Sequence, residues 1–421
     1  MKYSDRPISR PRDDLLGRAK FALSLARAIG SLRIAKDGFV IAIMGEWGSG
    51  KSSVVEMVSR YLLHLEMQSL ADSEEKTLSS IEELAEVYDR IRNKLRELAD
   101  ADLDIAMAHY EYRQSVFARW LGNNDEAILA DKYLTLLNKV QAAPSTIQIR
   151  FSPWMIAGRA ELTNAFLSDL ARTLGDKLGQ EVREPFARLL QRISELAPIA
   201  GTSLDLATGT GIGKLITSGG SWAGKLGERL TSGPTLDELR EKLRKSLNKI
   251  DGRRILVMID DLDRLTPSEA VEMVSLVKSL GDLPNVVYLL SFDRKNLAKL
   301  LEEGNRIDGH EYLEKIVQYP INLPPIEANG LSRLLNADLT EIFGSIDPPD
   351  ARRLSFTWHF AFRHYLKTPR QVRLYANSMA IAVPSQRDFV DLVDLALVEV
   401  LRLHEPDLYN WLRENLEELT E

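Results

Sequence analysis

The segment 45–52 constrains the fold more than any other part of the chain. It reads Gly-Glu-Trp-Gly-Ser-Gly-Lys-Ser, follows the apolar run 39–44 and precedes the helix-like segment 53–58. A strand, a tight glycine loop and a helix in that order form the pattern of a phosphate-binding P-loop. Its glycines let backbone amides face an anion, and the helix N-terminus adds free N–H groups. The pattern predicts binding of a nucleoside triphosphate.

The residues of this loop divide by the group that would touch the nucleotide. We expect the Lys51 ammonium to reach the β- and γ-phosphate oxygens, and the Ser52 hydroxyl to ligate Mg²⁺. The other expected phosphate-binding residues are Gly45, Glu46, Trp47, Gly48, Ser49, Gly50 and Ser53. A glycine turn that serves only the fold is the alternative interpretation.

Further apolar runs indicate the rest of a sheet. Residues 146–151, 255–259 and 285–290 read as strands, with helical patterns between them. Strands that alternate with helices predict an α/β fold with a parallel sheet. The near-continuous apolar character of 255–259 is typical of a central, buried strand. The chain is thus expected to be a P-loop NTPase with helical insertions and a C-terminal helical lid.

The composition along the chain suggests how this core is interrupted. The expected parts are a discontinuous core over 1–62 and 145–330, a helical hairpin insertion over 63–144, a helical insertion over 172–250 that contains a Gly/Ser-rich loop at 201–227, and a helical subdomain over 331–421. The hairpin is predicted from an apolar seam with spacings of three and four: Ile81, Leu84, Tyr88, Ile91, Leu95 and Leu98. The hairpin either packs on its own domain or binds a partner.

An acidic cluster follows the apolar run 255–259. A P-loop needs a carboxylate at the end of a neighbouring strand to anchor the metal, and Asp260 fits that place. Asp261 and Asp263 then compete to orient the attacking water. We favour Asp261, which can serve only if the strand has ended there, because neighbours on a strand point to opposite faces. The alternative is that these acids cap the next helix.

Polar residues also end the next predicted strand. Ser291 and Asp293 lie where ligands of open α/β sheets bind, so they could sense the γ-phosphate. Arg264 and Arg294 could stabilise transition-state charge, within one subunit or across an interface. The alternatives are a strand-to-helix turn for the first pair and surface ion pairs for the arginines.

Composition argues against several classes of protein and of functional site. A net charge of −7 argues against a chain that coats nucleic acid, and the absence of cysteine excludes disulfides and Cys-based metal sites. The six histidines show no close metal-ligand pair. The N-terminus lacks an apolar signal core, and no stretch of about 18 apolar residues occurs. We therefore expect a cytoplasmic protein without a transmembrane segment.

Five motifs in fixed order carry a family resemblance. They are Gly-Glu-Trp-Gly-Ser-Gly-Lys-Ser (45–52), Arg-Phe-Ser-Pro-Trp (150–154), Ile-Asp-Asp-Leu-Asp-Arg (259–264), Leu-Leu-Ser-Phe-Asp-Arg (289–294) and Tyr-Leu-Glu-Lys-Ile-Val-Gln-Tyr-Pro (312–320). Together they span most of the chain and resemble the KAP family of P-loop NTPases. The resemblance implies an ATPase, and its bacterial members imply a role in phage exclusion, defence or signalling.

The resemblance extends to two shorter segments. Asp-Leu-Leu-Gly-Arg at 14–18 is similar to the adenine-pocket motif of related signal-transduction ATPases, which implies that Gly17 and Arg18 favour ATP over GTP. Segment 367–373 resembles the family's lid, where Arg370 could report the γ-phosphate. The alternatives are ordinary helix starts at both places. Unlike many KAP proteins, this chain carries the Gly/Ser-rich loop where they insert transmembrane helices.

The residues thus predict a Mg-dependent ATPase that works as a switch, with ATP and Mg²⁺ as ligands. Its slow hydrolysis would change lid position or assembly. A homo-oligomer or a partner protein would be engaged through the helical insertions. Two alternatives stay open: a nucleotide-gated scaffold with little hydrolysis, and a nucleic-acid-stimulated ATPase, for which the acidic composition gives no support.

Overall fold

The computed structural model describes most of the chain. The described residues are 7–8, 10–32, 37–73, 83–90, 124–156, 159–179, 181–189, 236–250, 252–305, 308–327, 329–344, 347–416 and 418. The Gly/Ser-rich segment 201–227 lies outside them, as do Ile81, Ile91, Leu95 and Leu98 of the predicted seam.

The centre of the molecule is a five-stranded parallel sheet in the order β2-β3-β4-β1-β5. The strands are β1 (Phe39–Met44), β2 (Thr146–Phe151), β3 (Arg254–Ile259), β4 (Val286–Phe292) and β5 (Tyr319–Asn322). Every residue of β4 is buried, as its continuous apolar sequence predicts. The α/β fold with a parallel sheet is confirmed.

One expectation about the sheet is wrong. Asp260 follows β3, which we expected beside the P-loop strand, yet β4 lies between β3 and β1. The register pairs Met44 with Phe292 and Ile259 with Leu290. The carboxyl ends of β1 and β3 therefore lie level with the end of β4, and side chains of β4 can reach the space between the P-loop and Asp260.

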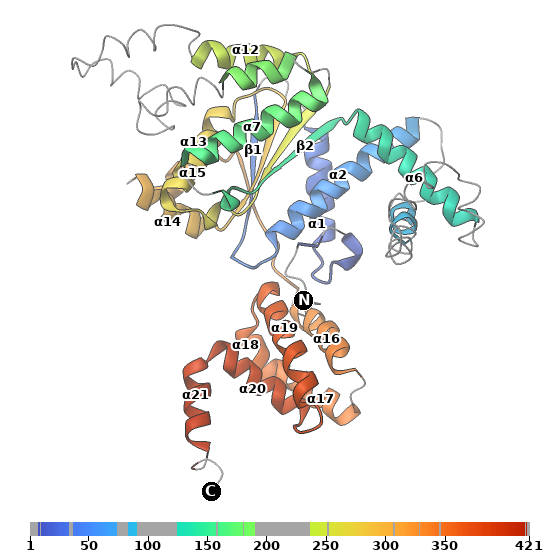
Figure 1. The fold of residues 1–421 in the computed structure, drawn as a ribbon, viewed down its shortest axis with the longest axis vertical. Coiled ribbons are helices and arrows are strands. Elements are labelled where there is room, and N and C mark those ends of the chain that lie inside the picture. The colour runs from blue at the N-terminus through green and yellow to red at the C-terminus, as the bar shows by residue number, and fades with distance from the viewer. Residues whose placement is uncertain are drawn as a thin grey trace, which may run out of the picture.

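Helices cover both faces of the sheet (Figure 1). One face packs on α1 (Ala19–Ser31) and α2 (Lys51–Ser73). The other face packs on α7 (Arg159–Leu178), α12 (Leu236–Asn248), α13 (Pro267–Leu280), α14 (Arg294–Asn305) and α15 (Gly309–Glu314). Alternate residues of each strand enter the two cores: Ile41 and Ile43 face α1 and α2, whereas Val40 and Ala42 face the other layer.

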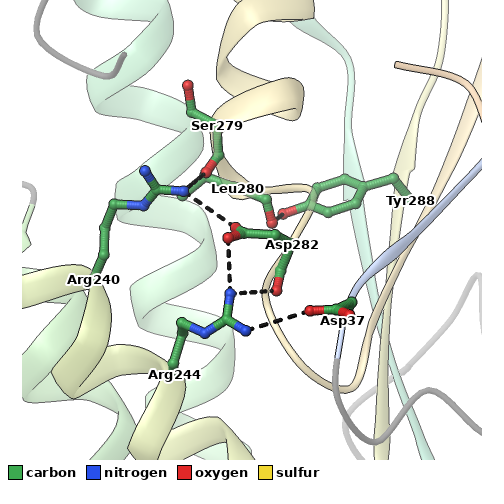
Figure 2. A network of polar contacts seen from close by, with 7 residues as sticks. All are labelled: Asp37, Arg240, Arg244, Ser279, Leu280, Asp282 and Tyr288. Atoms are coloured by element: carbon green, nitrogen blue, oxygen red, sulfur yellow. Dashed lines mark hydrogen bonds and ion pairs between the residues drawn. The ribbon is translucent and has the colours of Figure 1, made fainter. Parts of the chain in front are cut away.

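A polar network fixes α12 at the amino-terminal edge of the strands, away from the P-loop (Figure 2). Arg244 Nη1 lies 2.7 Å from Asp282 Oδ2, and its Nη2 lies 3.4 Å from Asp37 Oδ1. Arg240 Nη2 lies 3.2 Å from Asp282 Oδ1. Since Asp37 precedes β1 and Asp282 precedes β4, two arginines of one helix tie it to the starts of two adjacent strands.

The described part of the predicted hairpin is helical. α2 continues to Ser73, and α6 (Asn124–Ala142) packs against its second half together with the helical segment 83–90. Leu84 of the seam is buried in one cluster with Met67 and Tyr133, and Tyr88 packs against that cluster. The division of the chain into a core and insertions stays a prediction.

Helices alone form the C-terminal part, drawn from orange to red in Figure 1. They are α16 (Gly330–Phe343), α17 (Pro348–Thr357), the π-helix η4 (Trp358–Phe362), α18 (Arg363–Tyr365), α19 (Pro369–Gln386), α20 (Leu392–His404) and α21 (Pro406–Glu414). Their core includes Leu335, Phe362, Tyr375 and Met379. Within the described residues, no helix combines the length and the apolar character needed to cross a membrane.

Candidate functional site

The P-loop joins β1 to α2 in the conformation that its glycines predict. Gly48 and Gly50 have φ of 75° and 95°, the left-handed region that favours glycine. Lys51 is buried, and its Nζ donates hydrogen bonds to the carbonyls of Gly45 at 2.9 Å and Glu46 at 3.1 Å. The ammonium therefore lies across its own loop, held by two neutral acceptors.

Arg18 contacts the P-loop through a hydrogen bond to its backbone. Its buried guanidinium donates to the carbonyl of Ser49 and, at 3.1 Å, to that of Pro324, which follows β5. Burial lowers the pKa of Arg18 to about 10, and the negative charge of Asp14 opposes that shift. A Cβ on Gly50 would lie 3.0 Å from Arg18 Nη1, so the glycine is also needed for this close approach.

The segment before Arg18 is fixed by Asp14. The Asp14 carboxylate accepts from the amide of Leu16 at 3.1 Å and from that of Ala19, the first residue of α1, at 2.6 Å. Gly17 has φ of 75°, and a Cβ there would lie 3.1 Å from Glu327 Oε1. The turn at 14–18 thus delivers Arg18 to the P-loop.

Asp260 is oriented by β4. Ser291, fully buried in that strand, donates its hydroxyl to Asp260 Oδ1, and the Asp261 amide donates to the same oxygen at 2.9 Å. Within the described residues, no hydrogen bond reaches Asp260 Oδ2. Ser291 therefore positions the carboxylate and leaves one oxygen available to a ligand.

Asp261 satisfies the condition set by the sequence, because β3 ends at Ile259. Its backbone is left-handed (φ 60°, ψ 35°), and its carboxylate lies 2.9 Å from Arg264 Nη2 in η3 (Leu262–Arg264). Burial and the charge of Asp260 raise the pKa of Asp261 to about 6, while Arg264 opposes the shift. The Arg264 guanidinium also lies 5.7 Å from the ring centre of Trp154.

Asp263 is in a different environment. Its Oδ1 is buried and accepts no hydrogen bond from the described residues. Arg294, the other arginine singled out by sequence, begins α14 and pairs at 2.9 Å with Glu314, the last residue of α15. Neither residue lines the cavity at the P-loop.

That cavity, of about 620 Å³, lies at the carboxyl edge of the sheet and has the size of a small-molecule site. The predicted residues that line it are Arg18, Trp47, Gly48, Gly50, Lys51, Ser52, Ser53, Asp260, Asp261, Arg264 and Arg370. Gly45, Glu46 and Ser49 face a second cavity, of about 790 Å³, behind the loop. Gly17 and Ser291 border neither of these two cavities.

The C-terminal helices close the cavity from the other side. Thr368 caps α19, and the Arg370 guanidinium lies 4.7 Å from the ring centre of Trp47. A Cβ on Gly48 would lie 3.0 Å from Arg370 Cβ, so the lid and the loop are in close contact. Arg373, which also lines the cavity, pairs with the buried Asp338 of α16.

Sequence reasoning gave no role in the site to Trp154, Met155 or Arg373. Trp154 and Met155 are exposed large side chains in η2 (Pro153–Met155), directly after β2, and they line the cavity. Their position after a parallel strand was the available signal, because ligands bind at that edge. Arg373 had no such signal, since its pairing with Asp338 joins two helices of the lid.

Comparisons with known proteins agree with this geometry. The model of the KAP family P-loop domain matches residues 18–385. Phage T7 exclusion protein of Escherichia coli (strain K12) is 34% identical over 189 residues, which are 44% of this chain and 25% of that protein. The match thus spans about a quarter of that relative's length.

Two solved structures resemble the chain weakly. The Walker-type ATPase PABY2304 of Pyrococcus abyssi has a TM-score of 0.39 and 12% identity, covering 99% of this chain and 80% of that one. The Aeropyrum pernix ORC2 protein, in ADPNP–ADP complexes, has a TM-score of 0.38 and 9% identity, covering 94% and 70%. Neither similarity bears on the roles of individual residues.

Proposed function

The chain belongs to the KAP family of P-loop NTPases, and we propose that it binds ATP with Mg²⁺ in the cavity at the P-loop and hydrolyses it. One observation carries the proposal. The cavity gathers Lys51, Ser52, Asp260, Asp261 and Arg370, which come from distant parts of the chain. They include the cations, the hydroxyl and the carboxylates that phosphoryl transfer to water requires.

The phosphates would be held by the P-loop. Lys51 would exchange its two carbonyl partners for phosphate oxygens, which are stronger acceptors because they are charged. The backbone amides from Gly45 to Ser53 and the N-terminus of α2 would add neutral donors and the helix dipole. Arg18 would act on the base side, where Leu15 and Leu16 line the same cavity, and Gly17, which does not line it, would act through the turn that positions Arg18.

The residues present fit a magnesium ion. Ser52 offers a hydroxyl and Asp260 offers Oδ2, both hard oxygen donors. Mg²⁺ is typically held by one or two protein oxygens together with phosphates and water, and these two residues match that donor set. When bound, the ion supplies neutralisation of phosphate charge.

Asp261 would orient the water. With its pKa raised to about 6, the carboxylate is ionised at neutral pH and is still basic enough to accept a proton. Asp263 is the second choice for this role. Its buried Oδ1 accepts no hydrogen bond from the described residues and could take one from water, but Asp263 ranks below Asp261 because it does not line the cavity. Arg264 and Arg370 would stabilise the charge that develops on the transferred group.

The test compares phosphate release from Mg-ATP by the wild type, Lys51→Ala, Asp261→Asn and the control Arg294→Ala, whose side chain lies outside the cavity. Lys51→Ala should lose ATP binding, measured by calorimetry. Asp261→Asn should keep binding and lose turnover by roughly 10²-fold or more. Equal release from all four proteins refutes the assignment.

A second candidate, a nucleotide-gated scaffold with little hydrolysis, is favoured by one observation. Both hydrolytic groups have internal partners: Asp261 pairs with Arg264, and Lys51 with two carbonyls. A scaffold would bind ATP as tightly as the enzyme but release no phosphate, and Asp261→Asn would leave its behaviour unchanged. Single-turnover measurements on the wild type separate the two functions.

The name of the relative in Escherichia coli supports a role for ATP turnover in phage defence or signalling, within an oligomer or with a partner protein bound through the helical insertions. Expression of the chain in a phage-sensitive host should then lower the efficiency of plating. Lys51→Ala should restore plaques, with Arg294→Ala as the matched control. Equal plating with all three proteins contradicts this role.

A further inference from the structure

The two edge strands of the sheet differ in how their outer backbone groups are protected. Natural sheets blunt an edge by making its strand short and by placing proline in it, and β5 has both features: four residues and Pro320. β2 has six residues without proline, and among the described strands it pairs only with β3. The outer edge of β2 is therefore the better place for a further strand.

The hydrogen bonds to β3 leave half of the β2 backbone facing outward. The amide of Arg254 donates to the Ser145 carbonyl at 2.9 Å, and that of Asp260 donates to the Phe151 carbonyl at 3.3 Å. The odd-numbered residues of β2 thus bond to β3. Because the direction of the backbone groups alternates along a strand, those of residues 146, 148 and 150 point away from β3.

Two of these residues present unsatisfied backbone groups at the edge. Among the described residues, the amides and carbonyls of Gln148 and Arg150 have no hydrogen-bond partner. The amide of Thr146 differs, because it donates to the Glu66 carboxylate. Backbone N–H and C=O groups are normally paired in folded proteins, so the edge at Gln148 and Arg150 is suited to another strand.

A cavity of about 570 Å³ follows this edge. Its walls come from helices on both faces of the sheet, since α2 contributes Leu63 and α7 contributes Thr173. Gln148 and Arg150 line it between those walls. A cavity that helices of both layers share with the edge strand lies along the edge itself. We call this cavity the β2 groove.

We propose that the β2 groove binds an extended peptide segment of a partner protein, which adds to the sheet beside β2. Backbone hydrogen bonds to Gln148 and Arg150 supply affinity, and side chains that alternate toward α2 and α7 supply specificity. The groove is recessed between two helical layers, so it admits a single extended chain. The β2 edge of a second copy lies between its own helices α2 and α7, and two recessed edges cannot meet.

The charges of the groove favour a basic side chain in that peptide. Two of its carboxylates already have arginine partners. Glu66 has no cation within ion-pair distance among the described residues, and its Oε1 accepts no hydrogen bond from them. A lysine or arginine beside Glu66 gains a charge-assisted contact, and the next side chain on the same face packs on Leu63 and Tyr133, which line the groove too.

The experiment measures binding of two fluorescein-labelled peptides to the full chain by fluorescence anisotropy. The peptides are Lys-Thr-Val-Thr-Val and its reverse, Val-Thr-Val-Thr-Lys, which cover both directions in which a strand can add to β2. At protein concentrations up to roughly 300 µM, at least one peptide should bind saturably. Methylating its backbone nitrogens one at a time should weaken binding at alternate residues only, because every second amide faces β2.

Protein variants test the backbone contact and the charge contact separately. Gln148→Pro removes the outward amide and should weaken binding by roughly tenfold or more. Gln148→Ala is the matched control, because it loses the same side chain, keeps the amide and should bind like the wild type. Glu66→Gln should weaken binding by roughly tenfold, but should leave binding unchanged for a peptide with leucine in place of lysine. Circular dichroism and melting temperature check folding, and the methylated peptides test the same contact if Gln148→Pro unfolds.

The proposal is overturned if neither peptide binds saturably, or if methylation acts equally at every residue. It is also overturned if Gln148→Ala weakens binding as much as a folded Gln148→Pro does. Light scattering that finds a wild-type dimer, lost in Gln148→Pro, assigns the edge to a second copy instead. Lys51→Ala should bind the peptide normally, so failure of this proposal is distinct from failure of the ATPase proposal.

Discussion

Replacing Asp261 with asparagine should stabilise the folded protein near neutral pH while it removes turnover. The structure raises the pKa of Asp261 from 3.8 to about 6, mainly because the carboxylate is buried and then because Asp260 is negatively charged. The ionised form is therefore disfavoured in the folded state. Since one pKa unit corresponds to about 1.4 kcal/mol, keeping Asp261 charged costs the fold at most about 3 kcal/mol above pH 6.

The attraction of Arg264 is already contained in that shift, so it is not subtracted again. Asparagine must still be accommodated as a buried polar group, which costs about 1 kcal/mol. The expected gain for Asp261→Asn is thus about 1 to 2 kcal/mol at pH 7.5. The sign follows from linkage: the raised pKa favours folding most below the unfolded value of 3.8, where the protonated form predominates in both states, and that contribution is lost as pH rises through about 6.

The assay is urea unfolding of the wild type, Asp261→Asn and the control Asp72→Asn, an exposed aspartate at the end of α2, at pH 4 and pH 7.5. The Asp261→Asn advantage should be present at pH 7.5 and nearly vanish at pH 4, and Asp72→Asn should show neither change. The reasoning is refuted if Asp261→Asn is less stable than the wild type at pH 7.5. An advantage of equal size at both pH values refutes it too.

Three more perturbations probe the same site. Arg18→Ala should weaken ATP binding by roughly tenfold or more in calorimetry and lower the free energy of unfolding by about 2 kcal/mol, because two carbonyls lose a charged donor. Arg18→Lys, which lacks the two-pronged guanidinium, should recover only part of the binding and part of the stability. Trp47→Phe should keep ATP turnover, whereas Arg370→Ala should reduce it and change the Trp47 fluorescence, since the guanidinium lies over that ring. Ser291→Ala should lower turnover and raise the Mg²⁺ concentration for half-maximal rate several-fold, because Asp260 loses its buried donor, and unchanged magnesium dependence would contradict this role.

The sequence predicted the P-loop and the parallel sheet because both depend on local patterns. Six apolar residues, a glycine loop and a helix start are contiguous, so their geometry follows from short-range sterics. The order of the strands is not local. The local patterns therefore did not reveal that β4 lies between β1 and β3, an arrangement that makes Ser291 a partner of Asp260.

Contacts between distant segments also escaped prediction. Arg18 donates a hydrogen bond to the carbonyl of Pro324, 306 residues away, and neither composition nor residue spacing predicts such a pair. The Trp154–Arg264 contact is of the same kind, since it requires η2 and η3 to meet at the edge of the sheet. The motif at 367–373 lies beside the P-loop, since Thr368 caps α19 and the Arg370 guanidinium lies 4.7 Å from the ring centre of Trp47, and the γ-phosphate role of Arg370 stays a prediction.

Three cations of the cavity already have partners within the protein, and a bound nucleotide would compete with those partners. Lys51 is held by two carbonyls, Arg264 by Asp261 and the ring of Trp154, and Arg370 lies over Trp47. The carbonyl and cation–π contacts are weaker than a contact between the same cation and a phosphate oxygen, and a triphosphate, which carries more negative charge than one carboxylate, competes with Asp261 for Arg264. We infer that triphosphate binding draws all three cations from their present partners, which frees Asp261 at the same time. Binding and activation are then one event, as a switch requires, and a nucleotide without the γ-phosphate would leave the Asp261–Arg264 pair intact.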